Sequence, residues 1–362
     1  MNQSAASLRI GLAIGAGTGP ELTDVFRRTA TALAEVNGLT LELEAVPHRF
    51  RTFASASENG ALDVERAMQE DATIYEAFLR DFRRRGGCVV FRTAFNAPSL
   101  YRVRERLMAV KVEVLPLTSG EILLVRDATQ GFYAGENIVN ETGDEIQHIC
   151  SFRRSNTHRV LRFALAEAVS RYGSIAVLDH AVVVCKVHLL GPQFEQWVTD
   201  FSREAGISFQ VLQPDTTNRQ LLRGALDGRT LLVGANEWAD VMQPDLMARY
   251  GLGTQEERCS RTVYLDDDVM GLEEVQTAHG SADDLTGRGT VNPIATLRAA
   301  ALAIERFGGR GGVVNIMEEA ITSAARNGLR TPDAGGTSPT AVVVDHVLGR
   351  LASGTPSHVG VV

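Results

Sequence analysis

Short apolar runs alternate with stretches of helical periodicity along the chain. Leu8–Ile14 is an apolar run that predicts a buried strand, and Leu22–Ala34 repeats apolar residues at the spacing of a helix face. The same succession returns at Leu39–Val46, which predicts a strand, and at Ala61–Arg85, which predicts a helix. Cys88–Phe91 then predicts a further short buried strand.

The pattern continues through the middle of the chain. Helical periodicity is clearest at Thr157–Tyr172 and Phe194–Glu204. Further strands are predicted at Glu121–Val125, Ile175–Leu178, Ala181–Cys185, Ser208–Leu212 and Thr230–Val233. Because strands and helices alternate, we expect an α/β protein with a largely parallel sheet.

Length and composition fit a soluble globular protein. At 362 residues the chain is long enough for two domains or one large α/β unit, and its 44% hydrophobic and 22% charged residues are ordinary. A net charge of −8 argues against a general nucleic-acid binder, which needs a basic face. An anionic substrate stays possible, since a local arginine cluster suffices to bind it.

Cysteine usage and the terminal sequence favour the cytoplasm. The four cysteines include no Cys-x-x-Cys pair, which is typical of free thiols in a reducing compartment. The N-terminus shows no signal peptide, and no apolar run approaches the ~20 residues that a membrane helix needs.

The segment His279–Ala300 has an unusual physical character. Small residues at Gly280–Ala282 let the backbone approach a ligand closely, and Asn292 and Pro293 are typical of a helix start. A glycine-bearing loop that leads into a helix suits a nucleotide cradle, but an ordinary surface loop with a cap fits equally well.

This segment resembles the adenosine-binding loop of the β-decarboxylating dehydrogenases, the isopropylmalate and isocitrate dehydrogenase family. The family pattern is His-Gly-Ser-Ala-x-Asp followed by Gly-x-Gly-x-x-Asn-Pro. Its fixed positions are met by His279, Gly280, Ser281, Ala282, Asp284, Gly287, Gly289, Asn292 and Pro293. A carboxylate such as that of Asp284 can accept hydrogen bonds from both ribose hydroxyls and repels a 2′-phosphate, which predicts NAD as the cofactor.

The resemblance implies two α/β domains around a continuous mixed sheet. The large NAD-binding domain would comprise residues 1–105 and 261–362, and residues 106–260 would form a small domain with the dimer interface and the metal and catalytic residues. Gly15–Glu21 is not a dinucleotide fingerprint, because Pro20 stands where the final glycine is needed, so a Rossmann fold is rejected. A homodimer with active sites shared between subunits is expected.

Three aspartates form the metal-binding hypothesis. Scattered aspartates are usually surface residues, but Asp215 lies in a segment that resembles the one bearing the partner-donated metal ligand of the family. Asp240 and Asp245 resemble the family's other two ligands, although they are five residues apart instead of four, with Pro244 between them. Carboxylates suit a hard cation, so the resemblance implies Mg²⁺ or Mn²⁺.

Tyr133 and Lys186 are identified by resemblance as the proton-handling pair. Tyr133 follows an Arg-Asp-x-Thr segment similar to that around the catalytic tyrosine of the family, and Lys186 matches the lysine of its Lys-x-Asn motif. A lysine near a metal can have a lowered pKa, which suits a general base. His188 replaces the asparagine of that motif, which contacts the nicotinamide in relatives.

Substrate carboxylates are expected to meet basic residues. Arg102 and Arg126 are the candidate clamps, because a guanidinium matches a carboxylate bidentately. The second clamp arginine of the family falls at Val112, with Lys111 adjacent, so the resemblance implies that this clamp is lost or that Lys111 takes its place as a substrate-binding residue. The loop Arg92–Leu100 matches neither the isopropylmalate nor the isocitrate pocket.

These features predict NAD- and metal-dependent oxidative decarboxylation of a 3-substituted malate, a small 2-hydroxy diacid. Two alternatives remain open: a dehydrogenase of the tartrate or D-malate type, and a non-catalytic regulatory homologue that binds nucleotide. No nucleic-acid or membrane partner is expected.

Overall fold

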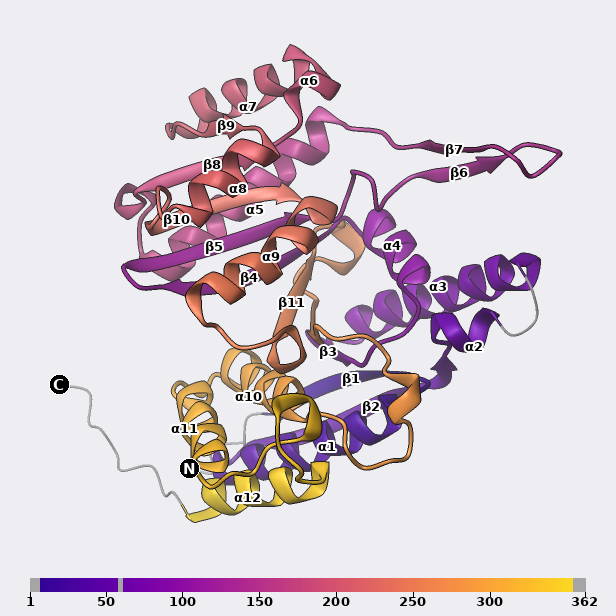
Figure 1. The fold of residues 1–362 in the computed structure, drawn as a ribbon, viewed down its shortest axis with the longest axis vertical. Coiled ribbons are helices and arrows are strands. Elements are labelled where there is room, and N and C mark those ends of the chain that lie inside the picture. The colour runs from indigo at the N-terminus through magenta and orange to yellow at the C-terminus, as the bar shows by residue number, and fades with distance from the viewer. Residues whose placement is uncertain (1–6, 58–60, 354–362) are drawn as a thin grey trace. The chain divides into compact units, whose positions relative to one another are not determined.

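The chain folds into two compact α/β units in the computed structural model, which describes residues 7–57 and 61–353 (Figure 1). The first unit lies within residues 1–99, 255–260 and 272–362, and the second within 100–254 and 261–271. Helices and strands alternate in both, so the predicted α/β class is confirmed.

The first unit contains four parallel strands and the helices that cover them. Its elements are β1 (Ser7–Gly15), α1 (Gly19–Val36), β2 (Thr40–Phe50), α2 (Phe53–Ser57), α3 (Ala61–Arg84), β3 (Val89–Arg92), β12 (Glu273–Thr277), α10 (Ile294–Gly308), α11 (Val313–Arg326) and α12 (Thr340–Ser353), with 3₁₀ turns η2 (Gln255–Glu257), η4 (Asp283–Leu285) and η5 (Pro332–Ala334). The strand order is β2-β1-β3-β12, with every pair parallel.

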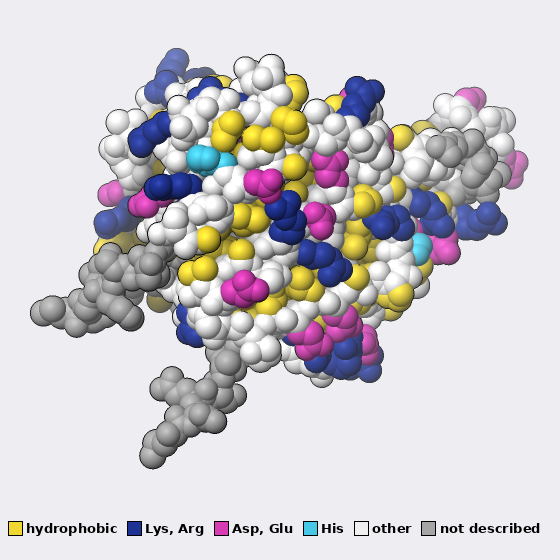
Figure 2. All heavy atoms as spheres, turned by 90° about the horizontal axis from the view of Figure 1, so that it is seen from below, with side chains coloured by type: hydrophobic (Ala, Val, Ile, Leu, Met, Phe, Trp, Pro, Cys, Tyr) yellow, Lys and Arg dark blue, Asp and Glu magenta, His cyan; other side chains and the backbone are white. Residues whose placement is uncertain are grey.

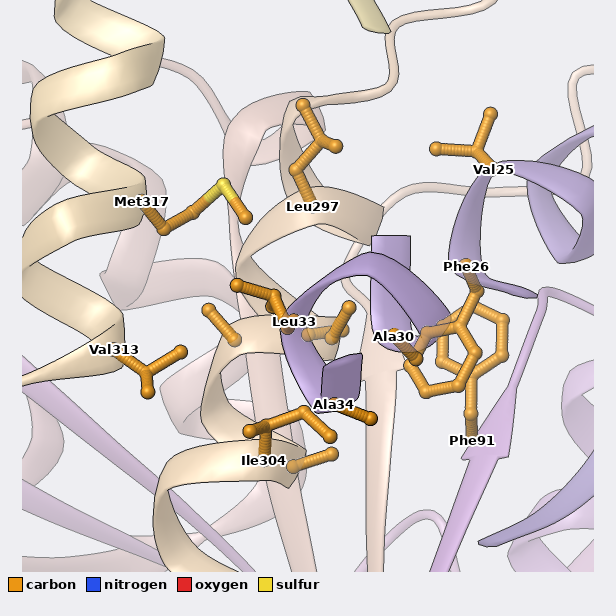
Figure 3. Packing of buried hydrophobic residues seen from close by; sticks show 14 of the residues in the cluster. Val25, Phe26, Ala30, Leu33, Ala34, Phe91, Leu297, Ile304, Val313 and Met317 are labelled. Carbon is orange, nitrogen blue, oxygen red and sulfur yellow. The ribbon is translucent and has the colours of Figure 1, made fainter. Parts of the chain in front are cut away.

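The core of the first unit lies between this sheet and helices α1, α10 and α11. The apolar face of α1 that the periodicity predicts is buried, and its Phe26 ring stacks on Phe91 of β3 at a centroid distance of 3.9 Å. Figure 3 shows Leu33 of α1 among side chains of α10 and α11, including Ile304 and Val313. Burial of these faces supplies the hydrophobic stabilisation of the unit.

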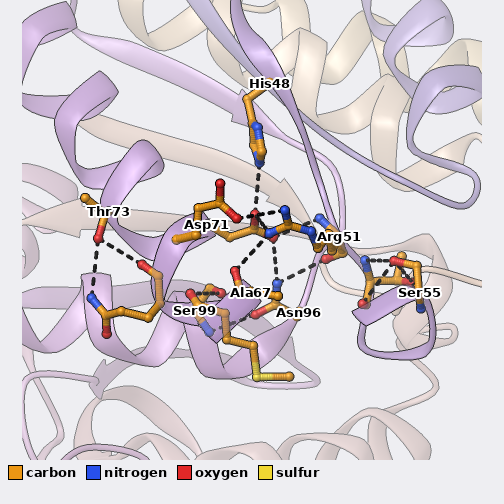
Figure 4. Close-up of polar contacts among 12 residues, drawn as sticks. His48, Arg51, Ser55, Ala67, Asp71, Thr73, Asn96 and Ser99 are labelled. Atoms are coloured by element: carbon orange, nitrogen blue, oxygen red, sulfur yellow. Dashed lines mark hydrogen bonds and ion pairs between the residues drawn. The ribbon is translucent and has the colours of Figure 1, made fainter. Parts of the chain in front are cut away.

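A buried carboxylate joins β2, α3 and the segment after β3. Asp71 is fully buried, and its oxygens accept hydrogen bonds from His48, from the backbone and guanidinium of Arg51, and from the side-chain amide of Asn96 (Figure 4). The side-chain Oδ1 of Asn96 in turn accepts a hydrogen bond from the Ser99 backbone amide, in the first turn of the next helix. A buried charge needs such partners, so this network fixes where that helix begins.

The second unit carries six strands of the large sheet and a separate hairpin. Its elements are α4 (Ala97–Arg106, which begins in the first unit), β4 (Ala109–Leu117), β5 (Gly120–Asp127), β6 (Glu136–Val139), β7 (Ile146–Ile149), α5 (Arg154–Tyr172), η1 (Ile175–Val177), β8 (His180–Val184), α6 (Val187–Leu190), α7 (Pro192–Ala205), β9 (Gln210–Leu212), α8 (Pro214–Leu222), β10 (Gly228–Ala235), α9 (Asn236–Tyr250), β11 (Cys259–Tyr264, which begins in the first unit) and η3 (Asp267–Val269). The order is β11-β4-β5-β10-β8-β9 within one ten-stranded mixed sheet, so the predicted mixed sheet is confirmed.

Strands β5 and β10 are buried on both faces, which explains their unbroken apolar sequences. Leu123 and Val125 of β5 face a core built with α5 and α7, while Ile122 and Leu124 face a second core built with α9. β5, β10, β8 and β9 are parallel, and β4 pairs antiparallel with both β5 and β11.

One predicted strand is wrong. Ile175–Leu178 forms the 3₁₀ turn η1, because the Ser174 side chain accepts from the Ala176 amide and the Leu178 amide donates to the Ile175 carbonyl. These local bonds satisfy the backbone in a turn, so the apolar side chains alone do not make a strand.

Charged side chains of both signs are interspersed on the face drawn in Figure 2, with apolar side chains between them. Among the described residues, no helix combines the length and apolarity needed to cross a membrane.

Candidate active site

Three predicted site residues lie where adjacent strands of the second unit end. Tyr133 is in the segment after β5, Lys186 follows β8, and Asp240 is in α9, directly after β10. Because β5, β10 and β8 are parallel neighbours, their carboxyl ends meet at one edge of the sheet, where α/β proteins place their ligands. Tyr133, Lys186 and Asp240 therefore all lie at this edge of the sheet.

Asp240 lies between a guanidinium and a phenol. Its Oδ1 accepts a hydrogen bond from Arg126 Nη2 at 2.5 Å, and its Oδ2 accepts one from the Tyr133 hydroxyl at 3.3 Å. Burial acts to raise the pKa of Asp240, but the adjacent Arg126 outweighs it and the pKa is lowered. Asp240 is therefore a carboxylate at neutral pH.

Tyr133 keeps its proton in this setting. Its ring stacks on Tyr101 of α4 at a centroid distance of 4.7 Å. Burial, and then the charge of Asp240, raise the pKa of Tyr133 to about 12. The hydroxyl is thus a fixed proton donor through the neutral range.

Arg126 is fully buried, and each of its three side-chain nitrogens donates hydrogen bonds to other groups of the protein. Nε donates to Asn236 Oδ1 at 2.9 Å, Nη1 to Gln243 Oε1 at 2.9 Å and Glu113 Oε1 at 3.5 Å, and Nη2 to Asp240 and the Asn236 carbonyl. A guanidinium has five N–H donors, and these contacts use them all. Arg126 would have to release a protein partner before it could hold a substrate carboxylate, and Glu113 and Gln243 escaped the sequence analysis.

Lys111 lies beside Arg126. The two are register partners on the antiparallel strands β4 and β5. Burial, and then the charges of Arg126 and Arg104, lower the pKa of Lys111 well below its ordinary value. Arg102, the other predicted clamp, is half-buried in α4, next to the Tyr101 ring that stacks on Tyr133.

Lys186 and Asp215 form a second, exposed cluster. Lys186 Nζ lies 3.5 Å from Asp215 Oδ1, and their side chains are 52% and 70% exposed. The backbone amide of Asp215 itself, and then Lys186, lower the pKa of Asp215. His188, in the short helix α6, is also exposed.

The lysine content of the chain carries a signal of its own. Lys111 and Lys186 are the only lysines of the chain, and all of its other long basic side chains are arginines. Because arginine suffices for a surface charge and lysine alone of the two can lose its proton in a protein, this bias singles out both positions.

Asp245 does not join Asp240. Helix α9 runs unbroken through Pro244, so a five-residue separation turns the two side chains apart by about 140°. Asp245 is exposed on another face of the helix. Within the described residues no group of three or more metal-ligating side chains comes together. The carboxylates of Asp240 and Asp215 suit a hard divalent cation, each as part of a site that other oxygen atoms complete.

A cavity of about 490 Å³ adjoins these residues in the second unit. Tyr133 and Lys186 lie in its wall with Asp127, and most of the other lining side chains are apolar. Burial raises the pKa of Asp127 to about 6, against hydrogen bonds from Thr129 and Gln130. Asp127 is a further titratable group that the sequence analysis missed.

The predicted cofactor loop lies in the first unit. The Ser281 carbonyl accepts from the backbone amide and the hydroxyl of Thr18, so the loop after β1 supports it. The Ser281 hydroxyl donates to Asp283 at 2.7 Å, while Asp284 is exposed. Ala282 adopts a left-handed conformation with φ of 45°, which turns the chain between them.

His279 and Asn292 share an unforeseen neighbour, Asp333. Asn292 Nδ2 donates to Asp333 at 2.8 Å, and Asn292 Oδ1 caps α10 by accepting from the Ile294 amide at 3.0 Å. Burial lowers the pKa of His279, and its Nε2 is buried with no hydrogen-bond partner within the described part of the chain. A buried orphaned nitrogen beside open backbone at Gly280 fits an adenosine group that supplies the missing partner.

The model of the isocitrate/isopropylmalate dehydrogenase family matches residues 99–347. A probable tartrate dehydrogenase/decarboxylase of Agrobacterium vitis is 28% identical over 64% of this chain and 63% of its own length. The chain thus spans less than two thirds of that relative. The 3-isopropylmalate dehydrogenase of Novosphingobium aromaticivorans is 25% identical over 95% of this chain and all of its own length.

Solved structures share the fold. A β-decarboxylating dehydrogenase of Thermococcus kodakarensis has a TM-score of 0.63 at 23% identity and covers 95% of this chain and 96% of its own. An isocitrate dehydrogenase of Methylococcus capsulatus has a TM-score of 0.66 at 18% identity, with 95% and 99% covered.

Proposed function

Because the chain belongs to the isocitrate/isopropylmalate dehydrogenase family, we propose that it oxidises and decarboxylates a small 2-hydroxy diacid with NAD and a divalent cation. The observation that carries this proposal is the hydrogen bond from the Tyr133 hydroxyl to Asp240, which places a proton donor beside a carboxylate. The two residues occupy the motif positions expected of a catalytic tyrosine and a metal ligand.

Two side chains handle protons in this proposal. Lys186, exposed beside Asp215, accepts the proton of the substrate hydroxyl, directly or through water. NAD, when bound, would supply the hydride acceptor that this oxidation needs. Tyr133, with its pKa raised to about 12, holds a proton that it delivers to the product carbon after CO₂ leaves. A divalent cation held by Asp240 and Asp215 would supply positive charge to the developing enolate.

The substrate is a 3-substituted malate or a close relative such as tartrate or malate. Lys111 and Arg102 are the proposed carboxylate ligands, since the donors of Arg126 are used within the protein. Because Val112 stands at the second clamp position, the part of the site that binds the substrate carboxylates has less positive charge than two clamp arginines would give it. The similarity to a probable tartrate dehydrogenase/decarboxylase favours the tartrate-type alternative.

NAD is the proposed cofactor. Exposed Asp284 can accept hydrogen bonds from the ribose hydroxyls and would repel a 2′-phosphate, while His279 offers its buried nitrogen to the adenosine. A regulatory homologue that binds nucleotide without catalysis is the second candidate, supported by His188 and the displaced Asp245. The cytoplasm is the proposed compartment, and it suits four free cysteines.

The proposed assembly is a homodimer that completes each site across subunits. Lys186 and Asp215 lie 3.5 Å apart, so a subunit that donates one donates both. Three large apolar side chains at the cavity, Phe132, Leu189 and Val241, are 64%, 79% and 69% exposed in the single chain. Apolar surface of this kind is typical of an interface.

Replacing Val241 with glutamate is expected to convert the dimer to a monomer that still folds. A charge buried at an interface without a partner weakens association by several kcal/mol, whereas an exposed charge on a monomer is tolerated. Light scattering after size exclusion measures the mass, and Val342→Glu, at an exposed position of α12, is the matched control. An unchanged dimer in the Val241 variant would contradict this placement of the interface.

The function is tested by following NADH formation with Mn²⁺ present. Isopropylmalate, isocitrate, homoisocitrate, tartrate and malate are compared, with CO₂ release measured for each. We expect one of them to be oxidised and the rate to vanish in excess chelator. Full turnover in chelator would exclude the metal-dependent mechanism, and no NADH with any diacid would favour the regulatory homologue.

A further inference from the structure

One face of α9 is matched to a single guanidinium. Asn236, Asp240 and Gln243 stand at positions i, i+4 and i+7 of the helix, and all three accept hydrogen bonds from Arg126 of β5. Arg126 and Gln243 are nearly inaccessible to solvent. The direction of the Asp240 side chain therefore depends on where Arg126 is held.

Glu113 of β4 is a further partner of Arg126. The Glu113 carboxylate accepts from Arg126 Nη1 at 3.5 Å and from the Gln243 side-chain amide by a short hydrogen bond. Gln243 uses both ends of its amide, because its oxygen accepts from Arg126 while its nitrogen donates to Glu113. This double use fixes the amide orientation and closes a ring of three side chains.

One guanidinium faces two carboxylates, of which Glu113 is 3% exposed and Asp240 is 41% exposed at the side chain. The buried Glu113 accepts hydrogen bonds from Arg126 and Gln243, whereas Asp240 also opens to solvent. Asp240 is therefore the one of these two carboxylates that a cation can approach.

We propose that Glu113 is a positioning residue that sets the divalent-cation affinity of Asp240 by sharing the charge of Arg126. With Glu113 in place, Arg126 orients the Asp240 carboxylate without neutralising it. Without Glu113, the whole guanidinium charge falls on Asp240, and the carboxylate becomes a weak cation ligand. The inference rests on the proposed function, since it takes Asp240 to be a metal ligand.

The test measures Mn²⁺ binding directly, by electron paramagnetic resonance of free Mn²⁺, on the full-length protein without substrate. Glu113→Gln keeps the shape and removes the charge, and it is expected to weaken Mn²⁺ binding about tenfold. The exchange variant Glu113→Gln/Gln243→Glu returns one carboxylate and one amide to the ring. Its Mn²⁺ affinity is expected within about twofold of the wild-type value.

The outcomes separate the two proposals. Unchanged Mn²⁺ affinity in a folded Glu113→Gln variant would overturn the role of Glu113 and leave the metal-dependent function standing. A wild-type protein that binds no Mn²⁺ without substrate would overturn the role of Glu113, whereas full turnover in excess chelator is the result that would overturn the metal-dependent function. Urea unfolding of each variant accompanies the titration; if Glu113→Gln does not fold, a folded exchange variant that binds more than about fivefold more weakly than wild type overturns the inference.

Discussion

Replacing Lys186 with methionine is expected to lower kcat for NAD reduction by about a thousandfold, because general-base catalysis is worth about 10²–10⁴-fold. Methionine keeps the length of the side chain and removes the proton acceptor. The substrate still binds through Lys111 and Arg102, so KM is expected to change little. The measurement is steady-state NADH formation with the diacid that the substrate comparison identifies.

The only other lysine in the chain provides the matched control. Lys111→Met removes a buried amine whose pKa is already lowered by burial and neighbouring arginines, so the fold is expected to tolerate it. Its expected effect is a higher KM, with kcat within about tenfold of wild type. If instead Lys111→Met abolished turnover and Lys186→Met did not, the general base would be Lys111.

Arg126→Met is expected to lower the free energy of unfolding by about 3–5 kcal/mol, the usual cost of removing one partner from a buried ion pair. The variant leaves Glu113 buried without its cation, and it strips Asn236 and Gln243 of a hydrogen-bond donor. Urea denaturation followed by circular dichroism gives the change.

Arg223→Met is the control for this loss, since Arg223 is exposed at the end of α8 and a surface change of this kind is worth about 0.5 kcal/mol or less.

A double variant distinguishes an energetic coupling between Arg126 and Glu113 from a general loss of stability. Adding Glu113→Gln to Arg126→Met should cost less than the sum of the single changes, because the two side chains interact. Additive losses would show that Glu113 does not depend on Arg126.

The strands and helices that could be predicted from the sequence are those whose pattern is set by burial on the sheet. Phe26 and Leu33 repeat at helical spacing because α1 covers the sheet on one face, and Leu123 and Leu124 are both apolar because β5 is covered on two. The failure at Ile175–Leu178 has a local origin. The Ser174 hydroxyl caps a 3₁₀ turn there, and the pattern of apolar and polar side chains does not reveal this backbone conformation.

The candidate site divides in the same way. Tyr133, Lys186 and Asp240 could be found because each lies in a segment that resembles a family motif, and each such motif is continuous along the chain. The partners of Arg126 could not be found this way. Asn236 and Gln243 are 110 and 117 residues away from it and meet it only through the packing of α9 on the sheet.

Lys111 shows the limit most clearly. Lys111 lies beside Arg126 because of the register in which β4 and β5 pair. Its pKa is lowered because it is buried near arginines. A sequence position records neither quantity. The sequence drew attention to Lys111 as the neighbour of the second clamp position, and the lysine composition of the chain is a further signal that singles it out.

Pro244 leaves one backbone carbonyl oxygen without its helical hydrogen bond in the helix that carries Asp240. Proline has no amide hydrogen, so it cannot donate to the backbone carbonyl of the residue four positions earlier, which is Asp240. Asp240 thereby offers a neutral carbonyl oxygen without its helical donor, on a residue that already bears a carboxylate. A chain with proline here in place of a second aspartate presents one negative charge fewer to a doubly charged acid, and repels such a substrate less.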